Sequence, residues 1–283
     1  MDIQLIDTGF FHADGGAMFG AIPKTAWSRR YPSDEQNGCI LAMRSVLVRD
    51  GNGRIILVDN GAGNKHLKQL SYYKFFDLVD LKDELQSRGV ACEDVTDVVL
   101  THLHFDHCGY TTQKEVQPDG KPLLKTTFPN ATHWVSRAQW ENFLHPNALE
   151  ADSYFIENMQ AVCDSGKLRL IESDTTLCPG VDLRLFDGHT PGQIAPYITT
   201  SERTYVFAGD VIPLAASVSP LWISAYDTCP VVSYNEKMRM LEEATSKKQA
   251  IIYCHDAYTR CSTVKKVNDF FTVDQKVSPF SKG

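Results

Sequence analysis

Four side chains that bind metal ions well lie within six residues near the middle of the sequence. They stand in the run Thr-His-Leu-His-Phe-Asp-His-Cys-Gly, residues 101–109, as His102, His104, Asp106 and His107. Imidazole nitrogens and carboxylate oxygens are the ligands that zinc and neighbouring first-row metals take up. Alternate side chains of an extended segment point to one side, so His102, His104 and Asp106 would share a face. The run predicts a metal site, and a histidine-rich polar loop is the alternative.

Apolar runs rich in β-branched residues predict the strands that would position such a site, and helical spacing of apolar residues predicts the helices. Strands followed by intermixed strands and helices indicate an α/β protein built in layers. The expected strands are 2–9, 40–48, 54–59, 96–101, 131–136, 181–186, 193–199, 204–209 and 250–254. The expected helices are 77–88 and 235–248, with a longer helical stretch at 137–164.

Five of these strands end on, or lead into, a histidine or an aspartate. Singly, each such residue would more often be a turn residue or a cap. Ligands of α/β proteins, however, gather where strands end, because a rigid sheet presents the loop residues there. Together they predict one convergent site. The residues are Asp59, His102, His189, Asp210 and His255.

The composition is that of a soluble globular protein with ample core, at 43% apolar and 22% charged over 283 residues. A net charge of −7 disfavours nucleic acid, whose phosphates need a basic surface. With neither an export signal nor a membrane-spanning run, we expect a cytoplasmic protein with no membrane partner. The eight cysteines are expected as thiols, with Cys108 filling space behind the histidine run. Histidines outside the motifs, such as His133, are expected to be structural.

The motifs together resemble those of the metallo-β-lactamase-fold hydrolases, in that family's order along most of the chain. The resemblance implies an α/β fold with a four-layer αββα sandwich. It also implies a single domain over 1–283, with a helical insertion on the substrate side near 137–164. The matching motifs are Val58-Asp59-Asn60-Gly61, Thr101 to Gly109, Asp187-Gly188-His189-Thr190-Pro191-Gly192, Ala208-Gly209-Asp210 and Cys254-His255-Asp256.

The resemblance further implies two divalent metal ions, most simply Zn²⁺, with manganese, iron or cobalt as alternatives. Three histidines would hold the first ion, an aspartate and two histidines the second, and one aspartate would bridge both. In that order these are His102, His104 and His189, then Asp106, His107 and His255, then Asp210. Asp59 would orient the ligand loop by hydrogen bonding. Asn60 replaces a threonine common in the family, with little consequence expected because both are small and polar.

The bridging aspartate narrows the subgroup, because class B β-lactamases lack it. It is typical of lactonases, glyoxalase II-type thioesterases and phosphodiesterases. The segment Asp14-Gly15-Gly16-Ala17-Met18-Phe19-Gly20 is similar to one in quorum-quenching N-acyl-homoserine lactonases of the YtnP-like group. A glycine-permitted turn with Met18 and Phe19 in the core is the alternative. Better-known lactonases carry a tyrosine where this chain has Pro213. Candidate replacements are Tyr110, Tyr226 and Tyr258.

The function expected from this resemblance is hydrolysis of a lactone of the N-acyl-homoserine lactone type. A water shared by two metal ions loses a proton near neutral pH and can attack the carbonyl carbon. Asp106 and Asp210 would be the catalytic carboxylates, with Asp106 as a proton shuttle. An acyl-chain pocket is expected from aromatic and sulfur-containing side chains, whose alternative is an ordinary place in the core. These are Met18, Phe19, Trp27, Trp140 and Phe143.

Three alternatives remain beside the lactonase. A glyoxalase II-type thioesterase is suggested by a basic C-terminal region over 260–283, which includes Lys282 but is short for a glutathione-binding domain. Hydrolysis of phosphoesters or phosphotriesters also suits a two-metal site. A metal-binding sensor without turnover is the alternative outside the enzymes, although it would need a broken ligand set. The expected partner is a small-molecule lactone or ester, and a homodimer is possible.

Overall fold

The computed structural model describes residues 1–278, and the chain divides into two compact units. The first comprises residues 1–9 and 43–172, and the second comprises residues 10–42 and the chain from Ser173 onward. Two long strands, β1 (Asp2–Asp14) and β2 (Gly38–Arg49), run from one unit into the other. The single domain expected from the sequence stays a prediction.

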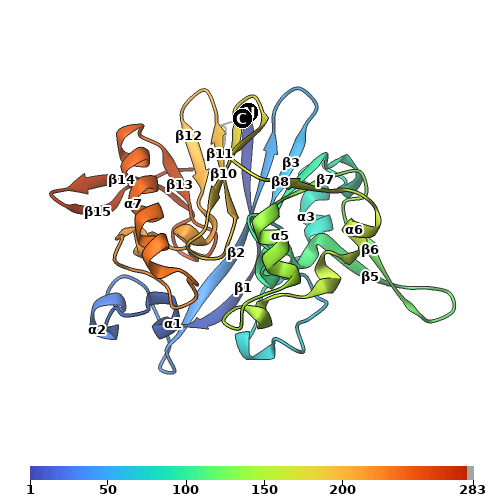
Figure 1. Ribbon diagram of the computed structural model, residues 1–283, viewed down its shortest axis with the longest axis horizontal. Helices are drawn as coiled ribbons and strands as arrows, with labels where there is room; N and C mark the ends of the chain where they lie inside the picture. The colour runs from blue at the N-terminus through green and yellow to red at the C-terminus, as the bar shows by residue number, and fades with distance from the viewer. Residues whose placement is uncertain (279–283) are drawn as a thin grey trace. The chain divides into compact units, whose positions relative to one another are not determined.

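The first unit is built on a six-stranded sheet in the order β1-β2-β3-β4-β7-β8. Strands β3, β4, β7 and β8 are parallel, which explains their apolar runs, because parallel strands are covered on both faces. Helices α3, α5 and α6 are drawn near these strands in Figure 1, and they contribute buried side chains to the same core. The strands are β3 (Ile55–Val58), β4 (Asp97–Val99), β7 (Thr132–Ser136) and β8 (Leu168–Ile171), with a separate hairpin of β5 (Thr112–Val116) and β6 (Pro122–Thr126). The helices are α3 (Leu81–Ser87), α4 (Phe105–Cys108), α5 (Arg137–Leu144) and α6 (Gln160–Asp164).

The second unit is built on a seven-stranded sheet in the order β15-β14-β13-β12-β11-β10-β9. All neighbours are antiparallel except β12 and β13, which are joined by the long crossover helix α7 (Pro230–Ser246). Buried Met240, Leu241 and Ala244 of α7 pack against the sheet, and Figure 1 shows this helix in orange beside β13 and β14. The strands are β9 (Thr175–Cys178), β10 (Val181–Phe186), β11 (Gln193–Thr199), β12 (Thr204–Phe207), β13 (Ala250–Ile252), β14 (Cys261–Val267) and β15 (Phe270–Lys276). Two short helices, α1 (Gly15–Phe19) and α2 (Lys24–Trp27), belong to this unit.

All nine expected strands are present, and so are the two shorter expected helices. The long helical stretch expected at 137–164 is wrong, because α5 ends at Leu144 and two 3₁₀ turns precede α6. Pro146 explains the break, since proline disfavours a helical conformation in the residue before it. The basic C-terminal region forms the hairpin β14–β15, while Lys282 lies outside the described residues. Among the residues described, no helix is both long and apolar enough to cross a membrane.

His133, in the middle of β7, has a side chain that is fully buried. Burial lowers the pKa of its imidazole from 6.5 to about 4. The unfolded chain therefore takes up a proton as the pH falls below about 6.5, while the folded chain does not. Stability contributed by neutral His133 is present above pH 6.5 and is lost as the pH falls toward 4.

We expect the free energy of unfolding of the metal-free protein to fall by about 2 kcal/mol more between pH 7 and pH 5 than that of His133→Leu. Urea titrations of both proteins at the two pH values measure this difference. The comparison cancels the titration of the other histidines, which both proteins share. Parallel pH dependences would contradict the prediction.

Candidate metal centre

The run of histidines in the first unit folds into a tight turn between β4 and α4. The ring centroids of His102 and His104 are 4.5 Å apart, and those of His102 and His107 are 4.0 Å apart. The Nε2 atom of His107 lies 3.7 Å from a carboxylate oxygen of Asp106. Asp106 occupies the first turn of α4, and His104 directly precedes the helix. The turn thus gathers all four metal-binding side chains that the sequence singled out there.

Asp59, which follows β3, holds this turn in place through hydrogen bonds to Thr101 and a contact with His107. Its Oδ1 accepts the backbone N–H of Thr101 at 2.7 Å, and its Oδ2 accepts the Thr101 hydroxyl at 2.8 Å. The same Oδ2 lies 2.7 Å from Nδ1 of His107. Burial raises the pKa of Asp59, and the contact with His107 acts in the opposite direction. Asn60 holds the 3₁₀ turn that follows α4, because its side-chain N–H₂ group donates to the Thr111 hydroxyl at 2.8 Å.

The end of the turn is packed against backbone. A Cβ placed on Gly109 would lie 2.0 Å from the carbonyl oxygen of Ala62, so glycine alone fits there without a shift. Cys108 is fully buried, and its Sγ donates to the carbonyl of Leu103 at 3.3 Å. Burial raises the pKa of the Cys108 thiol. These contacts match the space-filling role expected of Cys108.

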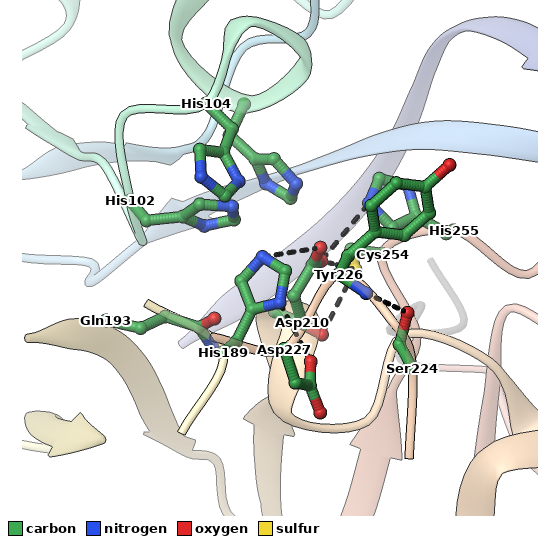
Figure 2. A network of polar contacts seen from close by, with 12 residues as sticks. His102, His104, His189, Gln193, Asp210, Ser224, Tyr226, Asp227, Cys254 and His255 are labelled. Carbon is green, nitrogen blue, oxygen red and sulfur yellow. Dashed lines mark hydrogen bonds and ion pairs between the residues drawn. The ribbon is translucent and has the colours of Figure 1, made fainter. Parts of the chain in front are cut away.

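The second unit holds a cluster centred on Asp210, in the 3₁₀ turn that follows β12 (Figure 2). One carboxylate oxygen lies 3.3 Å from Nε2 of His189, and the other lies 3.1 Å from Nε2 of His255. The thiol of Cys254 donates to Asp210 Oδ1 at 3.1 Å. Asp210 and His255 follow the parallel neighbours β12 and β13, whose carboxyl ends lie at one edge of the sheet. The seven predicted ligands therefore lie in two clusters, four in the first unit and three in the second.

Each of the five histidines has one ring nitrogen held by a neighbouring oxygen. For His255, Nδ1 donates to the carbonyl of Ala42 at 2.8 Å, which directs Nε2 toward Asp210. For His102, Nδ1 lies 3.0 Å from the Thr101 hydroxyl, whose own proton goes to Asp59. The remaining pairs are His104 Nε2 with Glu150 at 2.9 Å, His107 Nδ1 with Asp59 at 2.7 Å and His189 Nδ1 with Asp227 at 2.9 Å.

Glu150, Asp227, Thr101 and the Ala42 carbonyl were not identified from the sequence. Glu150 lies in an irregular segment after α5, and Asp227 lies in the loop before α7, so neither belongs to a recognisable pattern. Only Thr101 carried a signal, because it directly precedes His102. Lys237 of α7 anchors the loop that carries Asp227. Its Nζ donates to the Trp222 carbonyl at 2.8 Å, and burial lowers its pKa to about 8.

The glycine-rich segment at the N-terminus braces the same loop within the second unit. The carbonyl of Ala17, in α1, accepts the N–H of Ala225 at 2.8 Å and the Ser224 hydroxyl at 3.1 Å. Phe19 stacks on Trp27, with centroids 5.0 Å apart. Both side chains are at most 1% exposed, and Met18 is 4% exposed. These three side chains are buried, as in the alternative that places them in the core, and their assignment to a substrate pocket stays a prediction.

The other proposed pocket residues also contribute to a core. Phe143 is 5% exposed and stacks with half-buried Trp140 inside the first unit. Among the tyrosines considered in place of Pro213, Tyr110 is buried and its hydroxyl donates to Asp80. Tyr226, next to Asp227 in the chain, is 41% exposed, and Tyr258 is 50% exposed with its ring centroid 5.3 Å from that of Tyr31. Tyr110 is therefore not a suitable substrate donor.

Comparison with known proteins gives one family and several relatives. A model of the metallo-β-lactamase superfamily matches residues 44–110. An N-acyl homoserine lactonase from Bacillus thuringiensis is 25% identical over 174 residues, which cover 60% of this chain and 58% of that protein. The chain thus spans less than two thirds of that relative's length. A second N-acyl homoserine lactonase, from Agrobacterium fabrum, is 23% identical over 198 residues, or 68% of each chain.

Solved structures extend the likeness over the whole chain. A probable metal-dependent hydrolase from Staphylococcus aureus superposes with a TM-score of 0.85 at 27% identity, covering 98% of both chains. The dizinc quorum-quenching lactonase AidC superposes with a TM-score of 0.75 at 19% identity, covering 98% of this chain and 94% of the other. The chain therefore has the metallo-β-lactamase fold that its motifs predicted, and it carries that superfamily's sequence signature in residues 44–110.

Proposed function

We propose that this protein is a metal-dependent hydrolase whose two clusters together bind two divalent ions. One observation carries the proposal: all five histidines have one ring nitrogen held by an oxygen partner. Partners of this kind fix the orientation and tautomer of a histidine that binds metal. Nitrogen and carboxylate donors also fit zinc and its neighbours. We propose His102, His104 and His189 for one ion, Asp106, His107 and His255 for the other, and Asp210 between them.

Bound ions would supply Lewis acidity and lower the pKa of a coordinated water to about 7. The protein's own side chains would orient the ligand histidines and transfer protons. Asp59, Asp227 and the Ala42 carbonyl, which contact Nδ1 of His107, His189 and His255, would keep these imidazoles oriented. Asp106, whose side chain is 11% exposed, would carry a proton to the leaving alkoxide. With ions bound, Asp210 would act as a ligand beside His189 and His255, whose Nε2 atoms lie 3.3 Å and 3.1 Å from its two carboxylate oxygens.

We propose a lactone as the substrate, and an N-acyl-homoserine lactone as its first candidate. Support comes from the relatives named N-acyl homoserine lactonases and from the dizinc lactonase that shares the fold. Pro213 cannot supply the hydroxyl that other lactonases have there, and Tyr226, which is 41% exposed and adjacent to Asp227 in the chain, is the candidate replacement. A thioesterase of the glyoxalase II type is less well supported, because Arg260–Lys276 completes a sheet rather than a separate basic domain.

Removal and return of metal, followed by a substrate panel, tests this function. The chelator-treated protein should lose hydrolysis, and zinc, manganese, iron or cobalt should restore it. The panel contains acyl-homoserine lactones, simple lactones, thioesters, phosphodiesters and phosphotriesters. We expect kcat/KM to be highest for a lactone. Full activity without metal would refute the metal-dependent function, and a phosphotriester faster than every lactone would refute the substrate. Metal binding without turnover of any substrate would instead favour a sensor.

A further inference from the structure

A buried glutamate outside the metal-binding motifs contacts one of the histidines. Glu150 is 4% exposed and follows α5 in the first unit. Its Oε2 lies 2.9 Å from Nε2 of His104 and accepts the Tyr154 hydroxyl at 2.8 Å. Its Oε1 accepts the side-chain N–H groups of Asn142 at 2.8 Å and Asn147 at 2.6 Å. Both carboxylate oxygens are therefore acceptors in a buried network.

This arrangement defines the tautomer of His104. An ionised glutamate can only accept hydrogen bonds, as Glu150 does from Asn142, Asn147 and Tyr154. His104 must then donate through Nε2–H, and Nδ1 becomes the nitrogen that can bind a metal. The other four histidines are held at Nδ1 and would bind through Nε2, so His104 is oriented in the opposite sense. Figure 2 labels His104 beside His102.

The break after α5 is needed for this contact. In a continuous helix Glu150 would lie eight residues beyond Asn142, or about 12 Å along the axis. Their side chains could not then meet, yet they are 2.8 Å apart. Pro146 and the irregular segment after it turn the chain back, so that Asn142, Asn147 and Tyr154 surround the carboxylate. The end of α5 and the irregular segment after it thus place the buried Glu150 carboxylate next to His104.

We propose that Glu150 is a positioning residue that fixes His104 as the Nε2–H tautomer and thereby selects Nδ1 as its ligand atom. The choice of Nδ1 as ligand atom rests on the proposed function, because it requires that His104 binds a metal. The Nε2–H tautomer of His104 follows from its contact with Glu150 alone. Glu150 itself is unsuited to bind the metal, because four side chains already contact its two oxygens.

The test compares wild type with Glu150→Gln, which keeps the shape of the side chain but offers an N–H₂ group. Glu141→Gln, at an exposed position of helix α5, is the matched control. Proton–nitrogen correlation spectra of ¹⁵N-histidine-labelled, metal-free protein report the tautomer, and His104→Gln identifies the resonance. Competition with a chromophoric chelator then measures zinc affinity. Circular dichroism checks that each variant is folded.

We expect Nε2–H for His104 in wild type and in Glu141→Gln, and a shift toward Nδ1–H in Glu150→Gln. Zinc should bind Glu150→Gln about 10–100-fold more weakly, the usual effect of losing the partner of a ligand histidine. An unchanged tautomer, or a changed tautomer with zinc affinity within twofold of wild type, would overturn the proposal. If the expected tautomers are found but no variant hydrolyses any substrate, the proposed function fails while the hold of Glu150 on His104 stands.

Discussion

Asp210→Ala is expected to lower kcat/KM for the best lactone substrate at least about a thousandfold, equivalent to roughly 4 kcal/mol of transition-state stabilisation. The carboxylate lies 3.3 Å from His189 and 3.1 Å from His255, through a different oxygen for each. Alanine removes both oxygens, so the two histidines lose their common partner and the proposed bridge disappears. Steady-state kinetics and elemental analysis of metal per chain measure the two effects.

Asp269→Ala, in the exposed turn between β14 and β15, serves as the control and should behave as wild type. Asp210→Asn keeps the shape but has a single carbonyl oxygen, so its activity should fall between those of wild type and Asp210→Ala. Unfolding midpoints separate a chemical loss from a folding defect. An Asp210→Ala protein that keeps a normal metal content and more than about a tenth of wild-type kcat/KM would exclude the role given to Asp210.

Gly109→Ala, which adds one methyl group at the end of the histidine turn, should strongly lower the stability of the folded protein. The added Cβ would lie 2.0 Å from the Ala62 carbonyl oxygen and 2.3 Å from its carbonyl carbon, so backbone must move. Forced overpacking of this kind costs about 3 kcal/mol. For a protein of this size we expect the unfolding midpoint to fall by roughly 6–10 °C. Differential scanning calorimetry and urea unfolding measure the loss.

Gly89→Ala is the matched comparison, because a Cβ there meets nothing within 4 Å. Its φ of +71° adds only local backbone strain, of about 1 kcal/mol. Gly109 has an ordinary helical φ of −64°, so its cost arises from the collision alone. Equal destabilisation by the two substitutions would show that Ala62 yields easily and would refute the packing argument.

The sequence predicted the interior of both sheets well, because their strands are long apolar runs with buried faces. It missed six strands, which are β5, β6, β8, β9, β14 and β15. Most residues of β5, β6 and β15 face solvent, so no run of apolar residues marks them. The helical stretch after Arg137 failed for a different reason. Its apolar spacing continues past Pro146, but that residue ends the helix and the apolar side chains are buried from turns instead.

The proposed metal ligands could be named from the sequence because they stand directly after strands and belong to a recognisable motif, and their role as ligands stays a prediction. Their partners could not be named in this way. The acceptor for His255 is a backbone carbonyl, at Ala42, which any residue type would supply. Glu150 and Asp227 reach their histidines from irregular segments far along the chain. The sequence also left the role of the aromatic side chains open, since composition cannot distinguish Phe19 or Trp27 in a core from the same residues lining a pocket.

The membership of Phe10–Ala42 in the second unit has a consequence for biosynthesis. The remaining residues of that unit begin at Ser173, so all of residues 43–172 must leave the ribosome first. At about 5–20 residues per second, Ala17 waits about 10–40 s for its hydrogen-bond partners Ser224 and Ala225. Phe19, fully buried in the folded protein, spends that time without Trp222, whose ring centroid lies 5.7 Å from its own. An apolar segment near the start of the nascent chain is therefore synthesised well before its partners. We expect chaperones that bind exposed apolar segments to bind this one during synthesis.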